Sequence, residues 1–209
     1  MGIRVGRADN NKSNTRATGF TLLELLFTVM VAAIVIGIGS PAFSDFRRNA
    51  QLTRDANELL TSVQRARSEA AKRQRPVSLC AAADLSAAQP VCSGDPLTAV
   101  PASGWLLFED ANGDCVRTAD ASEPLLVTRE PFQRLAAAAT SARTCISFAA
   151  NGFLRSDGGP RVVYEVLFCD PDDPPPSSLR SFRLSPSGHA RVTRDPDEIA
   201  DSGLSCPAA

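Results

Sequence analysis

The sequence predicts an α+β protein in which a long N-terminal helix packs on a head built from an antiparallel β-sheet. Two observations predict it. An almost uninterrupted apolar run, residues 25–43, passes directly into a segment whose apolar residues recur every three or four positions, the helical period. After Pro76 the apolar residues form short runs between clusters of Gly, Pro, Asn and Asp, which is typical of strands and turns. A chain of 209 residues supports one globular head and this N-terminal element.

The apolar run has the dimensions of a membrane span. Between Leu25 and Phe43 the only polar side chains are those of Thr28 and Ser40, and a helix over this run is about 28 Å long, close to the thickness of a bilayer core. An alternative is a secretory signal peptide cut after Ala42, because Ser40 and Ala42 suit a small-residue cleavage site. That cut would release a soluble β protein beginning at Phe43, but the run is longer than the apolar part of such peptides.

Glu24 is the residue that a plain anchor or a signal peptide leaves unexplained. A carboxylate inside a membrane costs about 2.5–3.5 kcal/mol on insertion scales, so it needs a partner. Cleavage between Gly19 and Phe20 would create an α-amine on Phe20, four residues before Glu24, and residues at this spacing share one face of a helix. The ammonium group, of the same chain or of a neighbour in staggered register, would offset the cost and set the register of a helical stack.

The stretch Gly19-Phe20-Thr21-Leu22-Leu23-Glu24 resembles the processing motif of type IV pilins and type II secretion pseudopilins. The resemblance implies that a prepilin peptidase cuts after Gly19 and methylates the new N-terminal Phe20, and that Glu24 guides the subunit into a filament. It also implies, as further partners, the major and other minor pseudopilins or pilins and an inner-membrane assembly platform. Pro41 falls where many pilins have a helix-kinking proline.

The expected organisation is a cytoplasmic leader over 1–19, a transmembrane helix over 20–42, an amphipathic helix over 43–75 and a periplasmic β-rich head over 76–209. The leader carries four basic residues and one acidic residue, a formal charge of +3, and positive flanks stay on the cytoplasmic side. We therefore expect a single-pass protein of the bacterial inner membrane. The whole chain has a formal charge of −1, so its bulk charge indicates no polyanion partner.

The amphipathic helix offers an apolar stripe to the head and should end before Pro76, because the residue before a proline avoids helix. Its residues 56–60 and 66–70 resemble the corresponding helix of the GspH/FimT subfamily of minor pseudopilins, which implies a pilin-like fold. The stripe consists of Leu52, Ala56, Leu59, Leu60, Val63, Ala66 and Ala70.

The head is predicted to consist of short strands, with hairpin turns at 149–152, which contains Asn-Gly, and at 185–188. Its sheet must bury one face on the amphipathic helix. The strand that starts at Gly104-Trp105 runs into an Asp-x-Asn-Gly-Asp turn, as in the GspH/FimT subfamily. The predicted strands are 77–81, 104–110, 125–128, 145–148, 153–155, 161–169, 179–184 and 190–193.

The cysteines indicate disulfides, because an even number in an exported domain is typical of structural bridges. Six cysteines allow fifteen pairings, which the sequence leaves open. We favour Cys80–Cys92, because this bond closes a short loop and similar spacing occurs in the subfamily. Cys169–Cys206 would tie the tail across the last hairpin, which leaves Cys115–Cys145 as the third pair.

No metal site or cofactor is expected. Asp110, Asn112 and Asp114 have the spacing of the first ligands of a calcium loop, but Cys115 replaces the required Gly and Ala121 stands where the bidentate Glu belongs. We interpret the segment as a turn built on Asn-Gly. A zinc site is not indicated either, because no Cys-x-x-Cys pair occurs.

The late hairpin suggests a second function. Some members of the subfamily resemble DNA-uptake minor pilins with a Gly-Arg-x-Arg motif; here Gly188 and Arg191 match and His189 replaces the first Arg. Neutral His is a weak phosphate ligand, and alternating Arg is common on exposed strands, so DNA binding is not favoured. The cations that would contact phosphates are Arg180, Arg183, Arg191 and Arg194.

The sequence thus predicts a minor pseudopilin of the type II secretion machinery, which assembles into a periplasmic pseudopilus. The alternative is a minor type IV pilin of pilus assembly or DNA uptake. Enzymatic chemistry is not indicated, because His189 is the only histidine and neither a Gly-x-Ser-x-Gly motif nor a phosphate-binding Gly loop occurs.

Overall fold

The computed structural model describes residues 19–118, 122–132, 136–155, 163–170 and 179–206, with side chains described throughout except at 38–42. The chain divides into two compact units, one ending at Ser44 and the other beginning at Asp45. Helix α1, Leu22–Arg73, contributes its first part to unit 1 and its remainder to unit 2.

Helix α1 ends two residues before the predicted boundary at Arg75. Gln74 adopts a positive φ of 56°, and the amide of Arg75 donates to the carbonyl of Ala70 at 3.3 Å. This left-handed residue closes the last turn, since it lets the chain reverse while the carbonyl of Ala70 keeps a donor. Pro76 follows immediately and cannot continue the helix.

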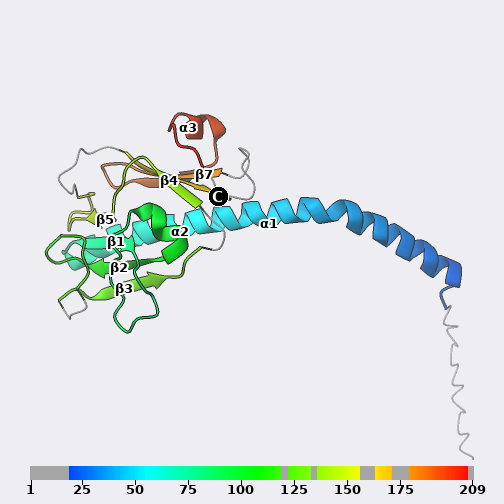
Figure 1. Ribbon diagram of the computed structural model, residues 1–209, viewed down its shortest axis with the longest axis horizontal. Coiled ribbons are helices and arrows are strands. Elements are labelled where there is room, and N and C mark those ends of the chain that lie inside the picture. Colours follow the sequence, from blue (N-terminus) through cyan, green and yellow to red (C-terminus); the bar gives the residue numbers. More distant parts are fainter. Residues whose placement is uncertain (1–18, 119–121, 133–135, 156–162, 171–178, 207–209) are drawn as a thin grey trace, which may run out of the picture. The chain divides into compact units, whose positions relative to one another are not determined.

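In the described part of unit 2 the strands form two antiparallel four-stranded sheets (Figure 1). The first has the order β3-β2-β1-β5, and the second has the order β4-β6-β7-β8. The first sheet consists of β1 Val77–Ala81, β2 Trp105–Glu109, β3 Leu125–Arg129 and β5 Cys145–Phe148; the second of β4 Ala136–Ala139, β6 Tyr164–Cys169, β7 Leu179–Leu184 and β8 Ala190–Thr193.

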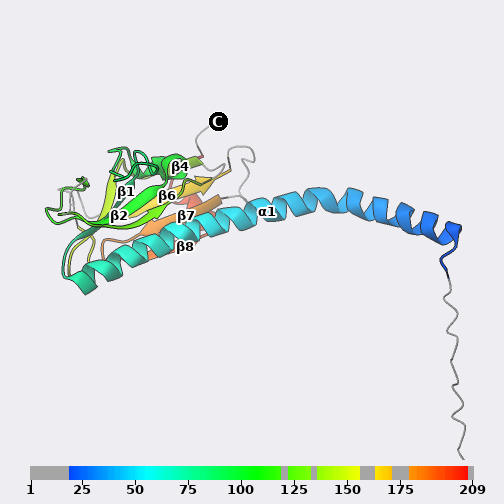
Figure 2. The same cartoon turned by 90° about the horizontal axis from the view of Figure 1, so that it is seen from below.

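The head half of α1 packs beside the sheets and supplies one wall of the core (Figure 2). The predicted stripe is confirmed: Leu60 is half-buried, and its other residues are buried. Both sheets contribute to this core, through residues such as Leu79 and Trp105 on one and Phe168 and Phe182 on the other. Burial of this stripe therefore holds both sheets to one helix.

Strands β1, β2 and β5 of the first sheet are buried on both faces. Successive side chains point to opposite faces of a strand, so Leu79 and Leu107 reach the main core while Cys80, Leu106 and Phe108 form a second cluster on the other side. Loop residues and disulfides cover that cluster, which explains why β1 and β2 are buried at every position.

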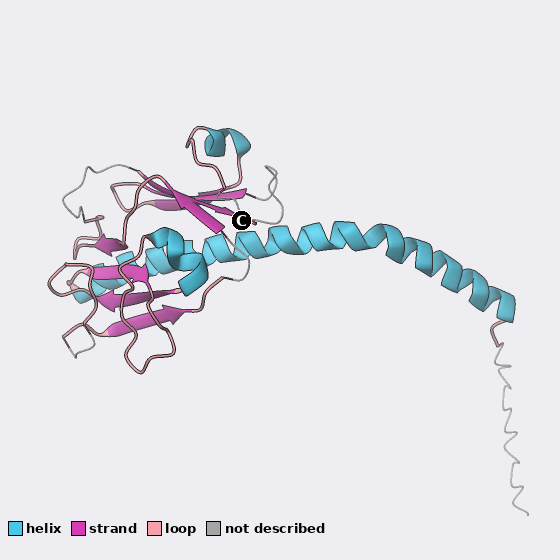
Figure 3. Ribbon diagram, in the orientation of Figure 1, coloured by secondary structure: helices cyan, strands magenta, loops and turns pink. Residues whose placement is uncertain are grey.

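The fold class is confirmed, but the number of sheets and some elements differ from prediction. The single expected sheet is two sheets, and strand β4 was missed because Ala is a poor strand former. The predicted strand 153–155 forms only an isolated bridge between Leu154 and Phe148, and the strand expected over 161–169 begins at Tyr164, with 161–162 outside the described residues. Three short helices were also missed (Figure 3): η1 Leu97–Ala99, α2 Val100–Ser103 and α3 Pro196–Ala200.

Among the residues whose side chains are described, no helix is long and apolar enough to cross a membrane. The transmembrane helix predicted over 20–42 is therefore not confirmed, and residues 38–42 of it, which include Pro41, lie outside that description.

Asp55 is an acid on the buried side of α1. It is 2% exposed, and its Oδ1 accepts from Nε of Arg54 at 3.3 Å, while no described residue donates to its Oδ2. Burial raises the pKa of Asp55, although the charge and hydrogen bond of Arg54 oppose the shift. The carboxyl group of Asp55 thus binds a proton more tightly in the folded state than in the unfolded chain.

This shift predicts a pH-dependent stability. In the folded state the pKa of Asp55 lies above the usual 3.8. The contribution of Asp55 to the free energy of unfolding is therefore fully present below about pH 3.8 and is lost as the pH rises through the folded pKa. We expect Asp55→Asn to raise the urea midpoint at pH 7 and to leave it nearly unchanged at pH 3. The exposed control Asp201→Asn should change neither midpoint, and equal midpoints for Asp55→Asn and the parent at pH 7 would contradict the assignment.

Candidate functional site

The predicted processing site lies at the start of α1. Gly19 and Phe20 precede the helix and are exposed, and Thr21 caps it: the amide of Glu24 donates to Oγ1 of Thr21 at 3.2 Å. The amide of Leu25 donates to the carbonyl of Thr21 at 3.1 Å and closes the first turn. The helix therefore begins at a fixed point just after the Gly19–Phe20 bond.

Thr21 is a helix-capping residue that the processing motif alone does not reveal. Thr21 and Glu24 have the spacing of a capping box, a Thr followed by a Glu three residues later, and this signal was available. Glu24 is exposed in the first turn, where the helix dipole favours a negative charge. The carboxylate of Glu24 thus lies in the first turn of a helix whose start is fixed by the Thr21 cap.

The segment from Phe20 to Ile36, which contains the first turns of α1, exposes apolar side chains on all sides. Phe20 is 84% exposed, and Ile36 still 69%. A helix that is hydrophobic all round needs lipid or other helices around it, and a continuous exposed surface of this kind marks an interaction site. Its exposed large side chains are Phe20, Leu22, Leu23, Leu25, Leu26, Phe27, Val29, Met30, Val31, Ile34, Val35 and Ile36.

Gly188 has a structural role in the predicted hairpin. It closes the turn between β7 and β8 with a φ of +77°, and its amide donates to the carbonyl of Ser185 at 2.9 Å. A Cβ at this position would lie 2.9 Å from Cε1 of Phe148 and 3.0 Å from the carbonyl oxygen of Gly152. Both the backbone conformation and the packing therefore require glycine here.

The structure does not gather the candidate DNA-contacting residues into one basic patch. His189 is exposed beside the turn, whereas Nη2 of Arg191 contacts Oε1 of Glu198 on α3 at 2.8 Å. A hydrogen bond from Thr193, and after it the hydrogen bond and charge of Arg191, lower the pKa of Glu198, so this partner is ionised at neutral pH. Arg191 is thus neutralised within its own chain.

The other arginines of this region also have local roles. Nε of Arg183 lies 3.2 Å from Oε2 of buried Glu165. Arg180 is buried, and its Nε donates to Oγ1 of Thr53 at 3.1 Å; burial first, and then the charge of Arg194, lowers its pKa. Arg194 lines a pocket with Arg180 at the start of the head half of α1, away from the pocket that His189 lines.

The cysteines pair as expected from the sequence, in the bonds Cys80–Cys92, Cys115–Cys145 and Cys169–Cys206, with Cα atoms 5.7, 6.0 and 6.2 Å apart. The first two cross the outer cluster of the first sheet, and the third joins β6 to the segment after α3. The bridged cysteines are 12, 30 and 37 residues apart in sequence, and each bridge can contribute about 2–4 kcal/mol to stability.

Comparison with known protein families decides the class of protein. The model of the family described as type II transport protein GspH matches residues 55–188. The chain belongs to the GspH family. No curated protein sequence matches the chain. Among solved structures, two crystal forms of the type IV minor pilin FimU from Pseudomonas aeruginosa are similar to it: each has 21% identity, with TM-scores of 0.49 and 0.45, covering 78% and 74% of this chain and 96% of FimU.

The GspH match covers a defined part of the molecule. It starts at Asp55 on α1 and ends at Gly188 in the last hairpin turn, so it contains α1 from Asp55 onward and the described strands from β1 to β7. Membership of the GspH family supports a pseudopilin- or pilin-type role for the chain. The processing motif at Gly19, Phe20 and Glu24 lies outside the match, and its roles remain predictions.

Gly188 allows a test that separates packing from backbone strain. Gly188→Ala forces a side chain into the left-handed region, at about 1–2 kcal/mol, and also overlaps Phe148, for which overpacking adds about 1–3 kcal/mol. Gly203 has a similar φ of +66° but open space around it, so Gly203→Ala should show only the first cost. Chemical unfolding would measure the stability of both variants. Equal losses in the free energy of unfolding would contradict a packing cost at Gly188.

Proposed function

We propose that the chain is a minor pseudopilin of the type II secretion machinery. Its leader, residues 1–19, is removed by a prepilin peptidase that cuts between Gly19 and Phe20 and methylates Phe20. Residues 20–42 anchor it in the bacterial inner membrane with the head in the periplasm. There it joins the major and other minor pseudopilins through an inner-membrane assembly platform. The GspH family match, described as type II transport, favours secretion over a type IV pilus.

One observation carries the proposal: the start of α1 exposes hydrocarbon on every side and holds one carboxylate, Glu24, in its first turn. Such a helix is unsuited to water, and packing among identical helices in lipid would cover it. The head, in contrast, has its own closed core. The two units therefore suit two tasks, lateral assembly through the helix and contact with other subunits through the head.

The assembly step follows from charge pairing. After the cut, the α-ammonium of Phe20 and the carboxylate of Glu24 lie about 6 Å apart along the helix axis, because each residue rises 1.5 Å. Within a bilayer core an unpaired charge is costly, so the carboxylate of a docked subunit would pair with the ammonium of a neighbour. A pair of this kind fixes how far one helix is shifted along the next.

The alternative, a DNA-uptake pilin, has less support from the described residues. Arg191 is paired with Glu198 and Arg183 with Glu165, so two of the four expected phosphate contacts are neutralised. Binding of double-stranded DNA by the purified chain at low salt, lost on Arg191→Ala, would favour this alternative over a function in secretion alone.

The assembly proposal predicts a mature chain that begins at Phe20 and a charge-dependent step after processing. We expect Glu24→Ala to be inserted and cleaved like the parent but to be depleted from sheared filaments, because the docking carboxylate is gone. The readouts are N-terminal sequencing and quantitative immunoblotting of the filament fraction.

Asp45→Ala is the matched control, since it removes an exposed carboxylate of the same helix outside the apolar run. It should assemble normally. A mature N-terminus other than Phe20, or full incorporation of Glu24→Ala, would refute the mechanism.

A further inference from the structure

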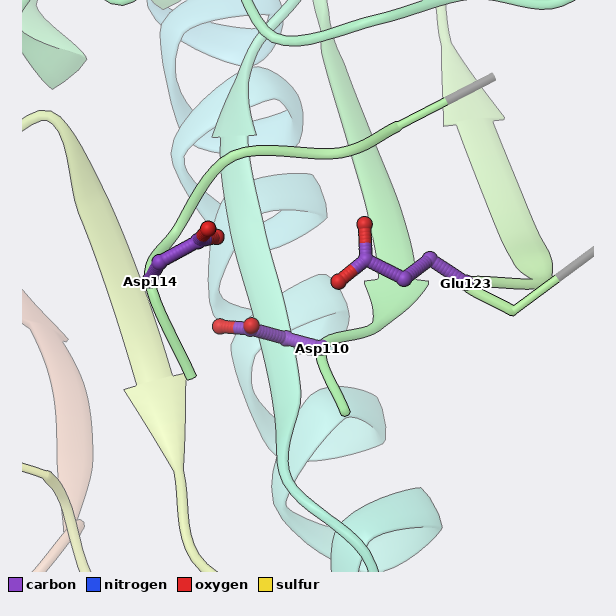
Figure 4. A group of neighbouring side chains, drawn as sticks. All are labelled: Asp110, Asp114 and Glu123. Carbon is purple, nitrogen blue, oxygen red and sulfur yellow. The ribbon is translucent and has the colours of Figure 1, made fainter. Parts of the chain in front are cut away.

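Three carboxylates meet at the edge of the first sheet. Asp110 directly follows β2, Asp114 lies four residues later in the same loop, and Glu123 precedes β3. One oxygen of each lies within 4.8 Å of those of the other two. Figure 4 shows the three side chains directed toward a common space.

Two of these acids are buried, and one has an unused oxygen. Asp110 is fully buried and Glu123 is 2% exposed. Oδ2 of Asp110 accepts from Oγ of Ser78 at 2.6 Å and from the amide of Cys115 at 3.2 Å, but no described residue donates to Oδ1. A buried polar oxygen without a donor is costly and requires a partner.

No ion pair within the described residues neutralises the cluster. The guanidinium of Arg155 packs on Gly113 in the same loop, but it makes no ion pair with these acids among those residues. Three like charges so close together destabilise one another, and buried charges in proteins are paired or coordinate metals. A bound cation would supply the missing partner.

The loop holds the acids in place without consuming all their oxygens. The amide and side chain of Thr118 donate to Oε2 of Glu123 at 2.8 and 3.0 Å, and the amide of Val116 donates to Oδ1 of Asp114 at 2.8 Å. The Cys115–Cys145 bond ties the loop to β5. The carboxylates are thus fixed before any ligand arrives, which lowers the entropy cost of binding.

The chemistry and spacing select the ion. Carboxylate oxygens suit hard divalent cations. Calcium–oxygen distances of about 2.3–2.6 Å place ligands on opposite sides of the ion about 4.6–5.2 Å apart, whereas magnesium at about 2.0–2.1 Å requires about 4.0–4.2 Å. The ligand oxygens lie within 4.8 Å of one another, a limit that includes the separations of opposed calcium ligands. We propose that Asp110, Asp114 and Glu123 bind one calcium ion.

This site differs from the simple turn that the sequence analysis expects. In the spacing of a calcium loop, Cys115 occupies the position of the required Gly and Ala121 that of the bidentate Glu. Glu123, two residues further on, reaches the cluster instead. The sequence spacing therefore missed a ligand that the loop geometry supplies.

Calorimetric titration of calcium into the full chain in detergent, after removal of metal with EDTA, tests the site. We expect one ion per chain, a higher Tm in calcium than in EDTA, and a smaller response to magnesium. Glu123→Gln keeps an acceptor for Thr118 but loses the charge, so it should weaken calcium binding by about tenfold or more. Without calcium it should be at least as stable as the parent, because it relieves like-charge repulsion.

Two further variants complete the test. Asp114→Asn changes an exposed ligand and serves if Glu123→Gln does not fold, and Asp95→Asn is the control, because Asp95 is an exposed acid of the same head outside the cluster. The proposal is overturned if calcium neither binds nor raises the Tm. It is equally overturned if calcium binds the ligand variants as tightly as it binds Asp95→Asn.

Discussion

Burial of the apolar stripe on the second half of α1 is the constraint on which the head depends. Leu52, Leu59 and Val63 contact a core to which both sheets contribute, and within the described residues the sheets share no strand. The helix is thus the common surface that fixes one sheet relative to the other. Large apolar side chains at these positions cannot be shortened without leaving a cavity between three elements at once.

The second constraint is the outer face of the first sheet. Because β1 and β2 are buried on both faces, something must cover the side away from α1. That cover is made of loops, which bury little apolar surface by themselves, and the Cys80–Cys92 and Cys115–Cys145 bonds cross it. The covalent links therefore stand where hydrophobic packing is thinnest.

Much of the fold follows from the sequence because its signals are local. The spacing of Leu52 to Ala70, the break at Pro76 and the turn at Ser185–Gly188 predict elements that the structure contains. Strand β4 carries no such signal: a run of alanines becomes a strand only because β6 offers it a pairing edge, from Ala136 with Cys169 to Ala139 with Val166. Helix α3 did carry one, Asp195 before Pro196, in which the side chain of Asp195 accepts from the amide of Asp197.

The candidate sites also differ in how local their sequence signals are. The motif at Gly19, Phe20 and Glu24 is contiguous, so the sequence alone identifies it, whereas the engagement of Arg191 depends on Glu198, which lies seven residues away on another element. Glu123 likewise joins Asp110 and Asp114 only through the path of the loop before β3. Partners brought together by tertiary structure are invisible to spacing rules that count residues along the chain.

The hydroxyl of Thr21 leads to one last consequence. It accepts a hydrogen bond from the amide of Glu24 at the start of α1, so the first turn would persist after removal of the leader. The new N-terminal ammonium group would then lie at the positive end of the helix dipole. The helix dipole would destabilise this ammonium group, and an anion from outside the first turn would stabilise it. Under the proposed processing, the carboxylate of a neighbouring subunit would be such an anion.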